Sequence, residues 1–232
     1  HYRWFTYAHR TAEFHQPLEM LKIEVDRQYA NKYLYDFGGI WQQTLESMTE
    51  WKSAALDPQA EFFSRHVAPV VEDGRTKVVV IISDGMRYEI AEQLASMIRS
   101  EDRFDAYLSA VLGSLPSYTQ LGMASLLPQS SLELTPEGLP VLADGKPTNG
   151  TANRDKILQA FNGHAMKAAN VLAMTSSELR ELYPKHQIFY VYHDRIDMTG
   201  DKQASETKTF EAVAQTVLEL SQLLGFIINS LN

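Results

Sequence analysis

The sequence contains no cysteine among its 232 residues, and this absence excludes disulfides, thiolate metal sites and a cysteine nucleophile. It is compatible with a reducing compartment, so we expect a cytoplasmic protein. No run of about eighteen apolar residues is present, so we expect no membrane-spanning helix. A signal peptide is not visible either, and because the chain opens at His1 rather than at a methionine, we expect a piece of a longer protein.

Positive charge is also scarce, since 21 Lys and Arg stand against 29 Asp and Glu and give a net charge of −8. Nucleic-acid binding depends on clustered Lys and Arg that release counterions from phosphates. The acidic balance therefore argues against a broad nucleic-acid-binding face and leaves nucleic acid an uncertain partner. A local metal cluster could still hold one phosphate, because a bound cation dominates the charge of its site.

The chain is 44% hydrophobic and is long enough for one main domain with an appendage. Up to about residue 71, apolar residues recur every three to four positions, which predicts helices, one of them starting at Asp57-Pro58. We interpret residues 1–75 as a helical subdomain whose aromatic residues form its core. In residues 76–232, strand and helix patterns alternate, which predicts an α/β fold with a mostly parallel sheet flanked by helices.

The expected strands are short and apolar, at residues 78–82, 104–112, 139–143, 165–173 and 187–193. The expected helices between and after them are at residues 87–100, 119–127, 151–161 and 203–231. A capping box formed by Thr175 and Glu178 predicts the start of one more helix.

The run KVVVIISDGMRYE, residues 77–89, carries the most informative pattern of the chain. Its five successive β-branched apolar residues predict a strand that is covered on both faces. Asp84 follows at the carboxyl end of this strand, where open α/β sheets place their functional groups. Because a helical pattern starts soon afterwards, Asp84 either caps that helix or binds a divalent metal ion through its carboxylate.

A second cluster lies in LGSLPSYTQLGMASLLP, where a Gly/Pro/Ser loop leads into a helix that begins near Thr119. A hydroxyl at this position either caps the helix or acts as a nucleophile beside a bound phosphate.

A third cluster, YHDRIDMTGD, supplies His193, Asp194, Asp197 and Asp201 within nine residues. Like charges this close need a cation or a well-solvated loop. Asp197 and Asp201 would share one face of a helical turn.

Taken together, DGMRYE, GSLPSYTQLGMASLLP, DGKPTNGTANRDKIL and YHDRIDMTGDK resemble the PglZ domain. This domain belongs to the alkaline phosphatase superfamily and is found in BREX-type bacterial anti-phage systems. The resemblance covers residue 77 to the end and implies that residues 76–232 are the N-terminal part of an alkaline-phosphatase-like domain. It further implies a metal-dependent phosphohydrolase, a phosphatase or phosphodiesterase, that acts on a phosphoester substrate.

The resemblance also assigns roles to residues. Asp84 matches a strand-end metal ligand, and Thr119 matches the metal-bound nucleophile, with Ser117 as the alternative. Asp197 and Asp201 match a segment that supplies ligands of a second metal. Asp201 stands where many relatives have His, so the site has an oxygen ligand at this position and its ligand set is harder. Zinc is the first expectation, with manganese or magnesium as alternatives.

The superfamily completes its two metal sites with a later Asp-His pair and a further His, which this chain does not contain. We therefore expect two divalent ions only in the complete domain, and weak metal binding and little activity from this piece alone. Further candidates for substrate binding or support of the site are His193, Arg87 and Lys202.

The main rival function is a catalytically silent scaffold that binds other defence components, such as a DNA methyltransferase. A scaffold has no need of Asp84, Thr119 and Asp197 at three strand ends. A haloacid-dehalogenase-like phosphatase would need a second Asp where this chain has Met86. A receiver-type phosphoacceptor would need an acidic pair and a suitably placed Lys that are not evident.

Overall fold

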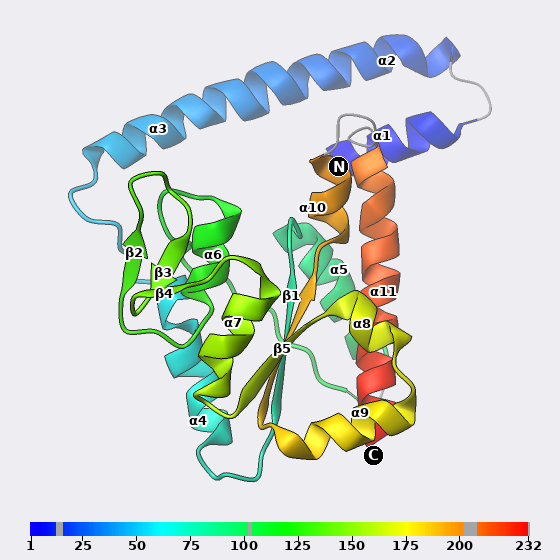
Figure 1. Cartoon of the computed structure of the whole chain (residues 1–232). Helices are drawn as coiled ribbons and strands as arrows, with labels where there is room; N and C mark the ends of the chain where they lie inside the picture. Colours follow the sequence, from blue (N-terminus) through cyan, green and yellow to red (C-terminus); the bar gives the residue numbers. More distant parts are fainter. Residues whose placement is uncertain (13–15, 102–103, 202–207, 232) are drawn as a thin grey trace. The chain divides into compact units, whose positions relative to one another are not determined.

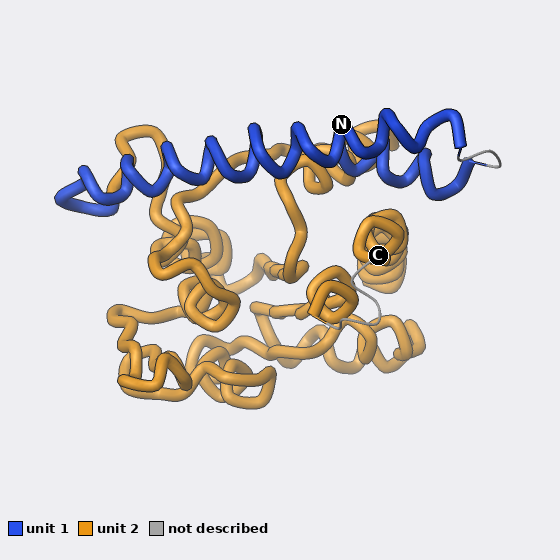
Figure 2. The backbone as a smooth tube through the Cα atoms, turned by 90° about the horizontal axis from the view of Figure 1, so that it is seen from above, with its two compact units in different colours: residues 1–51 blue, residues 52–232 orange. Residues whose placement is uncertain are grey.

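The computed structural model describes residues 1–12, 16–101, 104–201 and 208–231. The chain forms two compact units, His1–Trp51 and Lys52–Asn232, which Figure 2 shows in different colours.

The described part of the first unit is helical, with α1 (Tyr2–Thr11), α2 (Gln16–Arg27), the π-helical stretch η1 (Gln28–Asp36) and α3 (Phe37–Ser47). The last three follow one another without a break and form one long rod (Figure 1). Tyr2 holds α1 against this rod, because its ring stacks on Tyr29 at 3.8 Å between centroids and its hydroxyl donates to Asp26 Oδ1 at 3.0 Å.

The expectation that the aromatic residues of this region form a core is wrong for the rod. None of the residues of α2, η1 and α3 is buried, and Tyr35 and Phe37 are 80% and 56% exposed. A helix buries only the stripe that another element covers. Helix α1 has 10 residues and is too short to cover the whole rod.

The second unit is built on a parallel sheet with strand order β1-β6-β5. Its strands are β1 (Val78–Ser83), β6 (Ile188–His193) and β5 (Gly163–Lys167). Strand β1 pairs with β6 in a register that sets Val78 opposite Ile188 and Ser83 opposite His193. The residues that follow these two strands therefore lie at the same edge of the sheet.

The helices of this unit after β1 are α5 (Tyr88–Arg99), α6 (Thr119–Ser125), α7 (Gly150–Gln159), α8 (Ala168–Ala173), α9 (Ser176–Leu182), η4 (Tyr183–Lys185), α10 (Arg195–Gly200) and α11 (Thr209–Leu231). Side chains alternate along each strand, so the sheet presents two faces. Tyr190 and Tyr192 pack with residues of α6 and α7, whereas Phe189 and Val191 pack with residues of α8, α9 and α11 (Figure 1). The prediction of a sheet covered on both faces is confirmed.

The remaining elements of the second unit are η2 (Gln59–Glu61), η3 (Phe63–Val67), α4 (Ala68–Val71) and the small antiparallel sheet of β2 (Leu132–Leu134), β3 (Val141–Ala143) and β4 (Lys146–Pro147). Phe63 and Val67 belong to the core on the α7 side of the parallel sheet. Residues 52–75 thus belong to the second compact unit, and the division between the units lies after Trp51. The expected domain boundary after residue 75 stays a prediction.

Two strand predictions are wrong. In the segment expected to be a strand at residues 104–112, only Leu112 forms a bridge, to Pro58, and among the described residues this segment pairs with no strand of the parallel sheet. The strand expected at 165–173 ends at Lys167, and Ala168–Ala173 is helix α8. The sequence AANVLA has an apolar run of strand length, but its alanines favour a helix.

Helix α11 has the length and composition of a membrane span, although a core helix of a globular protein passes the same test. Its Leu223 and Ile227 pack against Phe189 and Val191 of the sheet, which is the arrangement of a core helix.

Candidate functional site

Asp84 follows β1 directly, and its N–H continues the strand pairing by donating to His193 O at 2.8 Å. Helix α5 begins at Tyr88, and its N-cap is Arg87, which makes no side-chain capping bond. The helix-cap interpretation of Asp84 is therefore wrong. Its half-buried carboxylate stands at the carboxyl edge of the sheet, which is where the metal-ligand interpretation places it.

Gly85 brings this edge into close approach with α10. Its φ of 73° lies in the left-handed region that favours glycine. A Cβ at this position would lie 3.1 Å from Ile196 Cγ2 and 3.2 Å from the backbone nitrogen of Asp197. The turn after β1 therefore packs directly on the first turn of α10, and Asp84 and Asp197 become neighbours.

The carboxylates at this edge repel one another. Burial raises the pKa of Asp84, and the charge of Asp197 raises it further, against the opposing effects of the Gly85 N–H and of Arg154. Burial also raises the pKa of Asp197, helped by Asp201 and Asp194. Such an arrangement favours either protons or a cation.

Helix α10 confirms the predicted helical spacing of Asp197 and Asp201. The N–H of Asp201 donates to Asp197 O at 2.9 Å, although Asp201 itself is exposed at the C-cap. Oxygen ligands of this kind suit a hard divalent cation. Within the described ranges, however, no three His, Cys, Asp or Glu side chains are grouped closely enough to hold a metal ion. The donors fit such an ion in type but are too few to enclose it.

Thr119 is the first residue of α6 and is exposed. The N-cap is Tyr118, which makes no side-chain capping bond, so the capping interpretation of Thr119 is wrong as well. Ser117 is exposed in the preceding loop. In the part of the chain that the structure describes, neither hydroxyl forms a hydrogen bond with Asp84 or Asp197.

Arg154 on α7 contacts the helix that begins at Thr119 and acts electrostatically on Asp84, and the sequence interpretation did not single it out. Its Nη2 donates to Gln120 Oε1 at 3.4 Å, beside Thr119. Its charge lowers the pKa of Asp84. The available sequence signal is the spacing of Arg154 from Ile157 and Leu158, because residues three and four positions apart share one helix face.

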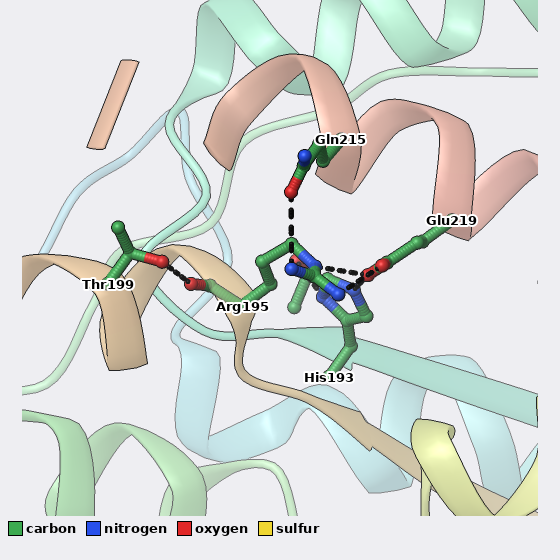
Figure 3. Close-up of polar contacts among 6 residues, drawn as sticks. His193, Arg195, Thr199, Gln215 and Glu219 are labelled. Atoms are coloured by element: carbon green, nitrogen blue, oxygen red, sulfur yellow. Dashed lines mark hydrogen bonds and ion pairs between the residues drawn. The ribbon is translucent and has the colours of Figure 1, made fainter. Parts of the chain in front are cut away.

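His193 is buried, and both of its ring nitrogens have protein partners. Its Nδ1 lies 3.2 Å from Ser83 Oγ, and its Nε2 lies 3.0 Å from Glu219 Oε2. Arg195 Nε donates to the same Glu219 oxygen at 2.6 Å and Arg195 Nη1 to Gln215 Oε1 at 3.2 Å (Figure 3). His193, at the end of β6, and Arg195, at the start of α10, are thereby bound to Glu219 of α11.

Glu219 was also missed from the sequence. Burial alone would raise its pKa, but hydrogen bonds from Arg195 and His193 lower it below the usual value. The available signal is one acidic residue between Val217 and Leu220, both of which are buried.

Two candidates remain, Arg87 and Lys202. Arg87 is exposed at the start of α5, and Lys202 lies outside the described residues. Their roles in substrate binding stay predictions.

Comparison with known proteins bears on most of the chain. The family described as the BREX system PglZ alkaline phosphatase-like domain matches residues 62–232. The alkaline phosphatase-like protein BrxZ of Escherichia coli O9:H4 (strain HS) is 41% identical over 220 residues, covering 93% of this chain and 25% of that protein. The alkaline phosphatase-like protein PglZ of Bacillus cereus (strain H3081.97) is 34% identical over 235 residues, covering 100% of this chain and 27% of that protein.

This chain thus spans about a quarter of the length of these curated relatives. The parallel sheet flanked by helices agrees with an alkaline-phosphatase-like α/β fold. Because the family match covers most of the residues, the chain belongs to the PglZ family of BREX-system alkaline phosphatase-like domains.

Proposed function

We propose that this chain supplies part of the active site of a metal-dependent phosphohydrolase that works in bacterial anti-phage defence. One observation carries the proposal: the close approach of Gly85 to α10 sets two half-buried carboxylates, Asp84 and Asp197, side by side at the carboxyl edge of the sheet. Two neighbouring carboxylates, one of which raises the pKa of the other, are suited to share a divalent cation.

In this proposal Asp84, Asp197 and Asp201 provide oxygen ligands, and Thr119 provides the nucleophile, with Ser117 as the alternative. Two divalent ions, zinc first and manganese or magnesium as alternatives, would lower the pKa of the nucleophile and offset the charge on the phosphoryl oxygens. The remaining ligands come from parts of the parent protein outside this chain.

The Thr119 hydroxyl would give up its proton to solvent, and its oxygen would attack phosphorus in line with the leaving group. A bond forms between Thr119 Oγ1 and phosphorus, the ester bond breaks, and the leaving alkoxide takes up a proton. Water then attacks the phosphothreonine, releases inorganic phosphate and restores the threonine hydroxyl.

The nucleophile is tested in the full-length parent protein with an aryl phosphate ester. Thr119→Ala should abolish turnover and leave the thermal unfolding midpoint unchanged, because the Thr119 side chain is exposed. Ser117→Ala is the matched control, since it removes an exposed hydroxyl from the same segment. Loss of turnover in Ser117→Ala alone would identify Ser117 as the nucleophile. Unchanged turnover in both variants would show that neither hydroxyl is the nucleophile.

Metal binding by the present chain is tested by calorimetric titration with zinc and manganese. We expect no micromolar binding, because losing supporting residues alone costs about 10- to 100-fold in affinity and the loss of direct ligands should cost more. Micromolar binding that disappears in Asp84→Ala would contradict this expectation and would mean that the partial site is sufficient.

A scaffold remains the second candidate because the first unit exposes many large apolar side chains, among them Met20 at 83% and Tyr35 at 80%. Exposed apolar surface of this kind often marks an interaction site. The proposed partners are other cytoplasmic defence proteins, with a DNA methyltransferase as one candidate. Co-purification of such a protein with the parent, lost on Tyr35→Ser together with Met20→Ser, would support the scaffold role.

A further inference from the structure

Arg154 is a buried cation. It is 7% exposed and lies on the face of α7 that also buries Ile157 and Leu158. Removing a charged group from water is costly unless an opposite charge or a full set of hydrogen bonds compensates for it. The partners of Arg154 therefore decide whether this residue is satisfied by the fold alone.

The partners of the guanidinium are uncharged. Its Nε donates to Thr148 O at 2.8 Å, its Nη2 donates to Gln120 Oε1 at 3.4 Å, and its Cζ lies 4.7 Å from the centre of the Tyr192 ring. A guanidinium has five N–H donors. Across the described ranges, no carboxylate lies within ion-pair distance of Arg154, whereas Arg195 is paired with Glu219. Arg154 thus retains N–H donors for a further partner, and none of the described carboxylates forms an ion pair with it.

This charge lies close to the candidate catalytic groups. Gln120, which accepts from Arg154, is adjacent in the chain to Thr119. On the other side, Arg154 acts electrostatically on Asp84 and opposes the rise of its pKa. The buried cation therefore contacts the helix that begins with the proposed nucleophile and acts electrostatically on the proposed metal ligand.

We propose that Arg154 binds the phosphoryl oxygens of the substrate, and this rests on the proposed phosphohydrolase function. A phosphate monoester supplies a negative charge that can pair directly with Arg154, and the planar guanidinium can donate two parallel hydrogen bonds to its oxygens. The Thr148 carbonyl and the Tyr192 ring hold the guanidinium in place, so little side-chain freedom is lost when the anion binds.

The test measures binding of inorganic phosphate to the full-length parent protein by calorimetry, with zinc or manganese present. Arg154→Met should weaken binding by about ten- to a hundredfold, the range for lost hydrogen bonds to a charged group. The phosphate affinity of Arg154→Lys should lie between those of the parent sequence and of Arg154→Met, because lysine keeps the charge but cannot donate two parallel hydrogen bonds. Arg180→Met is the control, since Arg180 Nε also donates to a backbone carbonyl, that of Ser230 at 2.7 Å, and the residue is exposed.

Unchanged phosphate affinity in Arg154→Met, or no phosphate binding by the parent protein at millimolar concentration, would overturn the proposal. If Arg154→Met does not fold, Arg154→Lys decides, and affinity equal to that of the parent would overturn it. An equal loss of phosphate affinity in Arg180→Met would also overturn the proposal, because the loss would then not be specific to Arg154.

The outcome is separable from that of the proposed function. Phosphate affinity that depends on Arg154, combined with aryl phosphate turnover that survives both Thr119→Ala and Ser117→Ala, would uphold the anion site and reject the nucleophile. Where turnover is present, Arg154→Met should raise KM as well as lower kcat, since the guanidinium contacts the phosphoryl group before and during the reaction.

Discussion

Gly85 is the residue on which the geometry of the candidate site depends. We predict that Gly85→Ala lowers the free energy of unfolding by about 2 to 3 kcal/mol, because the added Cβ combines left-handed strain with overpacking against α10. Urea denaturation monitored by circular dichroism measures this loss.

Gly74 provides the matched control for this prediction. It has a similar φ of 70°, but nothing lies within 4 Å of an added Cβ. Gly74→Ala should therefore cost only the conformational strain, about 1 kcal/mol. Equal losses in the two variants would mean that the close approach of Gly85 to Ile196 contributes nothing to stability.

At the scale of elements, Glu219 joins α11 to His193 and Arg195, and thereby holds α10 where Asp197 meets Asp84. We predict that Glu219→Gln lowers the free energy of unfolding at pH 7 by about 1.5 to 3 kcal/mol, the range for hydrogen bonds that involve a charged group. Chemical denaturation at several pH values measures the difference between the variant and the parent sequence.

The pH dependence of this difference has a defined sign. The folded state lowers the pKa of Glu219 below the ordinary value of 4.5, so the ionised carboxylate contributes stability above that value. The contribution disappears as the pH falls through the lowered pKa. The penalty of Glu219→Gln should therefore be constant near neutrality and shrink in acid.

An exposed ion pair serves as the control for Glu219. Glu92 lies 3.0 Å from Arg99, and both side chains are about half exposed. Glu92→Gln should cost less than about 1 kcal/mol, as is usual for surface pairs. A penalty for Glu219→Gln no larger than this, or one that grows in acid, would contradict the role assigned to Glu219.

At the scale of the whole molecule, the hydrophobic core clusters are formed by residues of the second unit. We predict that a chain starting at Lys52 folds by itself, with a cooperative urea transition at the midpoint of the whole chain. Loss of cooperativity would show that the first unit is required for folding.

The boundary expected from the sequence supplies the comparison. A chain starting at residue 76 lacks Phe63 and Val67, which are 8% and 1% exposed in the core. It should be less stable than the chain that starts at Lys52 by at least about 3 kcal/mol, because deleting buried large side chains leaves cavities. Equal stability would favour the boundary after residue 75.

The sequence by itself determined the elements whose signals are local. Five β-branched residues specify β1, the Thr175 side chain and Glu178 form the predicted capping box, and the run of apolar residues before His193 is β6. Local signals were insufficient at residues 104–112 and 168–173, because a short apolar run becomes a strand only where another strand pairs with it.

Only the tertiary structure decided which chemical groups meet. Parallel pairing of β1 with β6 brings Asp84 to the same edge as α10, and the close packing of Gly85 makes Asp197 its neighbour. Packing of α7 on the sheet buries Arg154 without a carboxylate partner among the described residues. Contacts between residues far apart in sequence depend on strand register and on which helix faces are covered, and neither is encoded in local spacing.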